Sequence, residues 1–222
     1  MRIPEIKTHN DDVETEVIHL EYIKSLKYSI EHPYNRDKLI KRIEKIVRQS
    51  YEYKDLILFL REEMNLDRCL ILSNIDIHTA RIELHHDPLR LYDVVDTVLR
   101  KHETLLGAEN INVFDIADEV MEIHYKEMIP LVPVTTTVHE LIHADEVFIP
   151  IQLISQGGFG NWRLFVSVYK KYMSPEFQKQ LRDYVYTSNK VIQEYSTPIL
   201  DRRYKYIDCD GVYLPKCIKK ED

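Results

Sequence analysis

Four histidines carry the chemistry that this sequence suggests. His139 and His143 are four residues apart in a segment whose spacing predicts a helix, so their imidazole rings should project from one face. Neutral imidazoles in this arrangement can hold one transition-metal ion and leave coordination positions open for water or a substrate. Two histidines at this spacing also occur on ordinary helix surfaces, so the pair alone does not identify a metal site.

The adjacent pair His85-His86 offers a further ligand. Alternating polar and apolar residues predict a half-exposed strand from Arg81 to His85, closed by Asp87-Pro88. Because neighbouring strand residues point to opposite faces, only one of the two histidines can bind the same ion. The other could face a nucleophilic water, and hydrolysis of a phosphodiester needs both a metal ion and a base. The alternative for such a pair is two structural rings satisfied by hydrogen bonds.

Helices are expected to dominate the N-terminal region. Apolar residues recur at helical spacing from Val13 to Ile30, His32-Pro33 breaks that helix, and Asn35 is the candidate N-cap of the next. The second helix should bury one apolar face and present a basic stripe on its outer side, formed by Lys38, Lys41, Arg42, Lys45 and Arg48. A third helix is expected around Lys54 to Met64.

The rest of the chain mixes helical and extended segments. Helices are expected at 91–103, 113–124 and 175–192, while Pro130 and Pro133 restrict Met128 to Val134 to an edge strand or an extended segment. The threonines at 135–137 offer an N-cap for the short helix that carries His139 and His143. The β-branched segment Val147 to Ile154 is expected to be extended.

The predicted fold class is therefore α+β. We expect a helical N-terminal region at 1–68, a core at 69–156 and a helical C-terminal region at 157–222. Three scattered cysteines are too few for a disulfide framework, and the N-terminus lacks the apolar core of a signal peptide. No apolar run approaches the ~20 residues that span a bilayer. These features predict a cytoplasmic protein without a membrane partner; they do not identify a protein partner.

The charge distribution bears on nucleic-acid binding. A net charge of −7 counts against binding by the whole surface, but residues 36–48 contain six basic and two acidic side chains. Phosphate contacts depend on such local basic groups. This segment is the best candidate for contact with DNA.

The arrangement of the histidines resembles the ββα-metal module of HNH endonucleases, especially the nuclease-colicin type. The segment Leu131 to His143 is similar to the second strand and metal-binding helix of that family, and the resemblance covers residues 69–150. It implies an HNH-like ββα-metal core, with the helices at 91–124 as an insertion and with helical N- and C-terminal extensions. A phage-encoded protein acting in the host cytoplasm would fit this resemblance.

The resemblance also implies a role for each histidine. His85, His139 and His143 would bind one divalent metal ion (Mg, Mn, Ni or Zn), and His86 would be the general base of a DNA endonuclease. The asparagine that orients this base in the family falls on Pro130, so a backbone carbonyl would have to orient His86 here.

Two other functions remain open. A non-catalytic relative could keep the fold and serve as a nucleic-acid-binding or assembly protein. His139-Glu140-Leu141-Ile142-His143 also matches the His-Glu-x-x-His motif of zinc metalloproteases, with Glu140 as the base. That motif normally lies within a long helix, which Pro130 and Pro133 prevent, and it leaves His85-His86 without a role.

Overall fold

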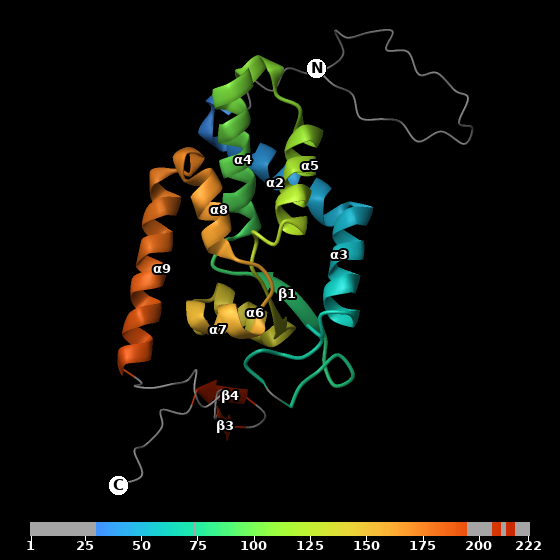
Figure 1. Ribbon diagram of the computed structural model, residues 1–222, viewed down its shortest axis with the longest axis vertical. Coiled ribbons are helices and arrows are strands. Elements are labelled where there is room, and N and C mark those ends of the chain that lie inside the picture. The colour runs from blue at the N-terminus through green and yellow to red at the C-terminus, as the bar shows by residue number, and fades with distance from the viewer. Residues whose placement is uncertain (1–29, 73, 195–205, 210–211, 216–222) are drawn as a thin grey trace, which may run out of the picture.

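The computed structural model describes residues 30–72, 74–194, 206–209 and 212–215 (Figure 1). The helix predicted from Val13 to Ile30 thus lies outside the described residues, apart from its last residue. Helices dominate the described part and surround a small antiparallel sheet, which confirms the predicted α+β class. None of the described helices is both long and apolar enough to cross a lipid bilayer.

Two consecutive helices open the described chain. Helix α2 (Pro33–Gln49) begins at Pro33, with His32 as its N-cap residue, so the prediction of Asn35 as the cap is wrong. Proline fits the first helical position because its fixed φ suits the helix and its missing N–H would be unbonded there anyway. Helix α3 (Tyr51–Glu62) follows directly, capped by the Ser50 hydroxyl, which accepts from the Tyr53 amide.

Two short strands form the sheet near the middle of the molecule. Strand β1 (Ile82–His86) pairs antiparallel with β2 (Leu131–Thr135), and the register runs from Ile82 opposite Thr135 to His86 opposite Leu131. Pro133 lies inside β2, and its carbonyl accepts from the Leu70 amide. The backbone N–H and C=O of Leu131 both hydrogen-bond to Phe159, on the side of β2 that faces away from β1. The backbone of Pro133, two residues further along, faces that same side. The proline therefore removes no β1–β2 hydrogen bond, as expected for an edge strand.

The predicted helices at 91–103, 113–124 and 175–192 are confirmed, and they build the upper body. Helices α4 (Leu91–Leu106) and α5 (Val113–Tyr125) stand side by side, joined through the short 3-10 helix η2 (Ala108–Asn110). Helix α2 packs against both, and α9 (Pro175–Glu194) lies along one flank beyond α8 (Trp162–Tyr169) and η3 (Lys170–Tyr172) (Figure 1). One apolar core runs through these helices and includes Ile43, Val98, Ile116 and Phe165, all fully buried.

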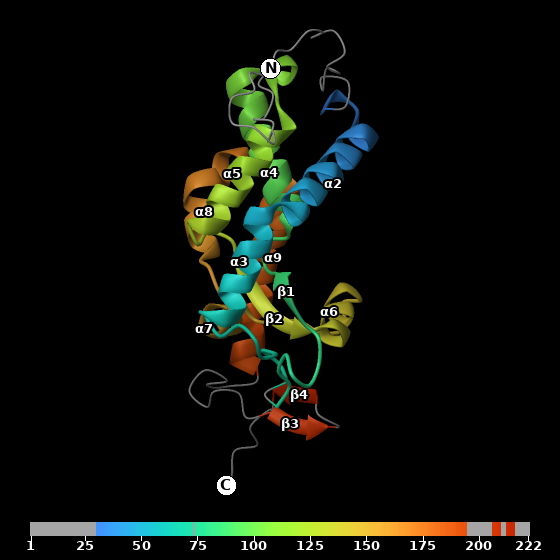
Figure 2. The ribbon, with the colours of Figure 1, turned by 90° about the vertical axis from the view of Figure 1, so that its right-hand side faces the viewer.

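Below this body, two short helices flank the sheet. Helix α6 (Thr136–His143) and helix α7 (Ile151–Gly157) lie on opposite sides of it, as Figure 2 shows, and a second apolar cluster lies between them. The prediction of an extended segment from Val147 to Ile154 is wrong from Ile151 onward. Pro150 is the N-cap residue, and burial of Leu153 and Ile154 against the sheet outweighs the β preference of the isoleucines. Two further strands, β3 (Tyr206–Cys209) and β4 (Val212–Pro215), pair with each other.

Candidate metal centre

Helix α6 begins where β2 ends. Thr135 is the last residue of the strand and the N-cap of the helix, and its hydroxyl accepts from the Val138 amide at 3.2 Å. This confirms the cap predicted at 135–137. No loop separates the strand from the helix, so α6 starts beside the sheet. It packs against both strands. His139 and His143 project toward β1 from this short helix.

The structure brings the three predicted ligands together. His139 Nε2 lies 3.0 Å from His143 Nε2, and the His85 ring centroid is 4.7 Å from that of His139 and 5.3 Å from that of His143. One nitrogen from each ring lies within 4.8 Å of the others. Two nitrogens bound to one tetrahedral ion at zinc distances are about 3.3 Å apart, close to the spacing of the α6 pair. The donor set therefore fits a single transition-metal ion.

Burial differs among the three rings. His85 is 7% exposed, whereas the His139 side chain is 28% exposed and His143 is exposed. Burial, together with the nearby His139 and His143, lowers the pKa of His85 to about 3, and burial also lowers the pKa of His143. His85 is thus neutral near pH 7, which is the form that binds metals.

Glu83 hydrogen-bonds one of the predicted ligands, and it is not among the residues predicted from the sequence. Its Oε2 accepts a hydrogen bond from His139 Nδ1 at 2.6 Å, which leaves Nε2 of that ring for the ion. Burial would raise the pKa of Glu83, but the hydrogen bond from His139 and the charge of Arg81 outweigh it and lower the pKa. The available signal was strand periodicity, because Glu83 and His85 are two residues apart and share one face of β1.

His86 lies on the other face of β1, away from the three ligands. It is 5% exposed, its ring stacks on Tyr53, and its Nε2 is 3.1 Å from His124 Nε2. His124 Nδ1 donates to the Val120 carbonyl, so its Nε2 accepts and His86 Nε2 donates. Burial, with the neighbouring charges, keeps the pKa of His86 well below its ordinary value and lowers that of His124 to about 4. The structure therefore places the predicted base in the core, beside the fully buried His124.

A cavity of about 440 Å³ opens beside His85 and His143, with α9 forming its far wall. Tyr184 on that wall lies within hydrogen-bond distance of Asp87 Oδ2, at 2.6 Å, and of the Ile149 carbonyl. The Tyr184 hydroxyl is the donor in both contacts, and the Asp87 carboxyl and the Ile149 carbonyl accept. Burial raises the pKa of Asp87 to about 7 and outweighs the hydrogen bond from Tyr184 and the charge of Arg90, which lower it. This contact ties α9 to the end of β1.

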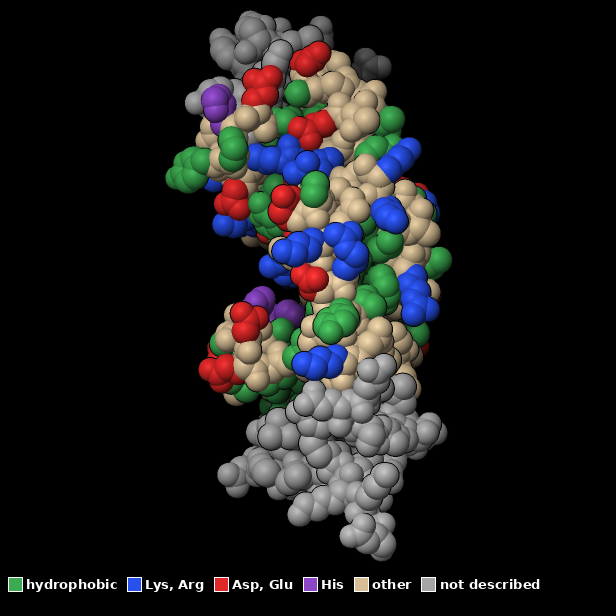
Figure 3. Space-filling view, turned by 90° about the vertical axis from the view of Figure 1, so that its left-hand side faces the viewer, with side chains coloured by type: hydrophobic (Ala, Val, Ile, Leu, Met, Phe, Trp, Pro, Cys, Tyr) green, Lys and Arg blue, Asp and Glu red, His purple; other side chains and the backbone are tan. Residues whose placement is uncertain are grey.

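Positive charge lies across from the histidines. Figure 3 shows histidines on the rim of a hollow, with Lys and Arg side chains gathered on the body above it. Arg48, in the last turn of α2, and Arg90, before α4, both act on His143 and help to lower its pKa. Other members of the 36–48 segment have structural partners, because Arg36 pairs with Asp96 and Glu103, and Lys41 with Asp37.

The structure places the third predicted ligand, His85, on β1 rather than in the segment after α6. Glu140 is exposed on α6 and is not part of the ligand group that the described residues form. Pro130 is buried just before β2, so no side chain there can orient His86. The arrangement could hold a metal ion with three imidazoles, and two of these rings, His85 and His143, line the cavity.

Comparison with protein families gives a match over most of the chain. A family model described as "Bacteriophage G278-like virion protein" matches residues 2–211. No curated protein and no solved structure matches the chain.

Proposed function

The chain belongs to the bacteriophage G278-like virion protein family, and we propose that it hydrolyses DNA phosphodiester bonds with one divalent metal ion held by His85, His139 and His143. The expected phage origin is confirmed by this family. The HNH-like character of the core, the metal ion and the DNA substrate are parts of the proposal. The order β1, β2 and α6, with α4 and α5 inserted between the strands, supports a ββα-metal core.

Three histidines beside a cavity, with no fourth protein ligand among the described residues, carry the proposal. Structural zinc sites are usually closed by four protein ligands, whereas catalytic sites use three and keep a position for water or substrate. Here the described residues supply three ligands, one of them exposed, and the cavity adjoins two of them. This pattern favours catalysis over a purely structural ion.

Nearby positive charge supports the proposed substrate class. Arg48 and Arg90 lie near the three histidines; Arg90 also pairs with Asp93 at 2.7 Å. Guanidinium groups bind phosphate oxygens with charge-assisted hydrogen bonds. A divalent ion at this site would activate a water molecule and polarise a phosphate oxygen. Glu83 holds His139 in the tautomer that presents Nε2, and Arg48 and Arg90 would hold the phosphodiester.

The position of His86 bears on how water is activated. For His86 to act as the base that the HNH resemblance implies, its ring would have to leave His124 and turn to the other face of β1. We therefore assign His86 a packing role in the described conformation. On this assignment, His86→Asn leaves nicking largely intact in protein that remains folded.

A plasmid-nicking assay tests the proposal. Supercoiled DNA is incubated with Mg²⁺, Mn²⁺, Ni²⁺ or Zn²⁺ and with wild type, His139→Ala, His86→Asn or His78→Ala. His78 is exposed and outside the ligand group, so His78→Ala is the matched control. We expect metal-dependent nicking that His139→Ala abolishes and the control keeps. Nicking that survives His139→Ala would exclude this site as its source.

A second candidate is a non-catalytic metal-binding subunit of the virion. The burial of His86 against His124, together with Pro130 in place of an orienting asparagine, favours it. This candidate predicts metal binding by the three histidines without nicking by any metal. Casein cleavage that Glu140→Gln abolishes would instead support the metalloprotease alternative.

A further inference from the structure

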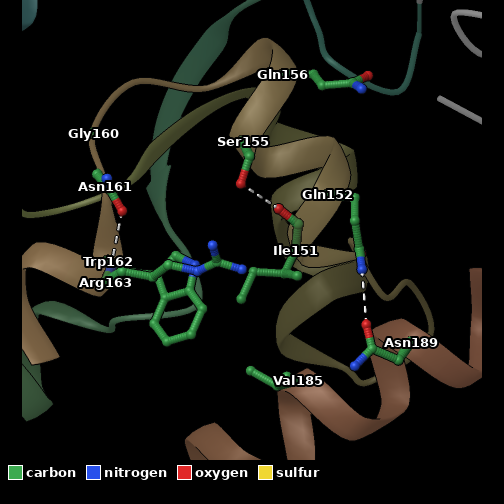
Figure 4. Close-up of a pocket in the computed structure, with 10 residues that line it drawn as sticks. All are labelled: Ile151, Gln152, Ser155, Gln156, Gly160, Asn161, Trp162, Arg163, Val185 and Asn189. Carbon is green, nitrogen blue, oxygen red and sulfur yellow. Dashed lines mark hydrogen bonds between the residues drawn. The ribbon is translucent and has the colours of Figure 1, made fainter.

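A second cavity lies between α7, the start of α8 and α9. Its volume is about 580 Å³, and none of the metal ligands lines it. Figure 4 shows Trp162 and Arg163 on one side and Gln152 and Asn189 on the other. The cavity is therefore a site distinct from the histidine cluster, with its own chemistry.

Carboxamides dominate the polar lining of this cavity. Gln152, Gln156, Asn161 and Asn189 contribute to it, and no carboxylate, histidine or cysteine does. Gln152 Nε2 donates to Asn189 Oδ1 at 3.0 Å, while Gln152 Oε1 is buried and has no hydrogen-bond partner. A buried acceptor without a donor is costly, so a small shift of the Gln152 side chain that lets this oxygen accept from a ligand hydroxyl or amide N–H would be favourable. Such a lining suits a ligand rich in hydroxyl and amide groups and does not suit a cation.

The charge of the cavity is positive in a protein whose net charge is −7. The Arg163 guanidinium lies 5.6 Å from the Trp162 ring centroid, and no carboxylate among the described residues forms an ion pair with it. A smaller hollow of about 270 Å³ shares Trp162 and adds Lys170 and Arg182, again without a carboxylate in its lining. The two hollows adjoin at Trp162 and Val185, each contains cationic side chains, and together they are called the α8–α9 groove here.

We propose that this groove binds a saccharide that carries an anionic group. The carboxamides would pair with its hydroxyl or acetamido groups, Trp162 would pack against the apolar face of a sugar ring, and Arg163 would take the anion. Nucleic acid is the less favoured ligand, because neutral carboxamides outnumber cations in the larger cavity, whereas affinity for nucleic acid depends on the number of cations.

Tryptophan fluorescence tests this directly, because Trp162 is the only tryptophan of the chain. The full chain is titrated in EDTA, so the outcome is independent of the proposed metal chemistry. The probes are N-acetylmuramic acid, N-acetylglucosamine and N-acetylglucosamine 6-phosphate, which share a ring but differ in charge. A thymidine tetranucleotide is the nucleic-acid probe. The variants are Arg163→Gln, Asn189→Ala and the control Arg42→Gln, whose exposed arginine lies outside both hollows.

We expect a saturable fluorescence change with an anionic sugar, and the preferred anion identifies a carboxylate or a phosphate as the charged group. The neutral sugar should bind about tenfold more weakly, as loss of a charged hydrogen bond implies. Arg163→Gln should remove this preference, Asn189→Ala should weaken all three sugars, and Arg42→Gln should change nothing. Equal binding of neutral and anionic sugars, no response to any sugar, or a response to the tetranucleotide alone would overturn the proposal.

Discussion

Glu83→Gln should weaken metal binding without removing a ligand. In the folded protein the Glu83 carboxylate accepts from His139 Nδ1 at 2.6 Å, a distance typical of a charge-assisted hydrogen bond. A glutamine oxygen can still accept this bond, but it carries no charge, and Arg81 loses its ionic partner at 3.0 Å. His139 would then be a less basic and less firmly oriented ligand.

The expected magnitude follows from comparable carboxylate–histidine–metal arrangements. Loss of the carboxylate partner typically costs 10–100-fold in affinity, or about 1.4–2.7 kcal/mol. At a metal concentration 100 times the wild-type Kd, binding stabilises the wild-type fold by about 2.7 kcal/mol. The same concentration should stabilise Glu83→Gln by only about 0.4–1.4 kcal/mol.

Isothermal titration calorimetry with Ni²⁺ or Zn²⁺ measures the affinity, and thermal unfolding with and without metal measures the stabilisation. Glu140→Gln is the matched control, because Glu140 adjoins His139 in the chain but is exposed and outside the ligand group. A folded Glu83→Gln variant that binds metal as tightly as wild type would refute the orienting role. Equal weakening in both variants would point to a general charge effect instead.

Two further predictions concern stability. Burial would raise the pKa of Glu119, but hydrogen bonds from His102, Lys101 and Tyr169 outweigh it and lower the pKa from 4.5 to about 2. Glu119→Gln should therefore destabilise the fold by on the order of 2 kcal/mol at pH 7, after allowance for solvent screening. In urea unfolding this difference should persist down to about pH 4.5 and disappear as the pH falls toward 2; a pH-independent difference would contradict the assignment. Gly160 has a φ of +86°, and a Cβ there would lie 2.3 Å from the Ile129 carbonyl oxygen. Gly160→Ala should therefore lower the thermal midpoint of unfolding. An unchanged midpoint would contradict the close approach.

The local geometry of the metal ligands could be predicted from the sequence. The four-residue spacing places His139 and His143 on one face of a helix, and Thr135 can cap that helix, whatever the rest of the chain does. The adjacency of His85 and His86 likewise dictates that the two rings point to opposite faces of a strand. These features depend on backbone periodicity over a few residues.

Only the tertiary structure decided which face of β1 meets α6. The Glu83 and His85 face meets it, so His85 joins the ligands and Glu83 orients His139, 56 residues away in the chain. The opposite face packs on α3 and α5, which buries His86 against Tyr53 and His124. Backbone periodicity is the same for either choice of face. The packing of distant apolar surfaces therefore selects which face meets α6. For the same reason the segment from Ile151 is a helix despite its β-branched residues, since burial against the sheet outweighs local propensity.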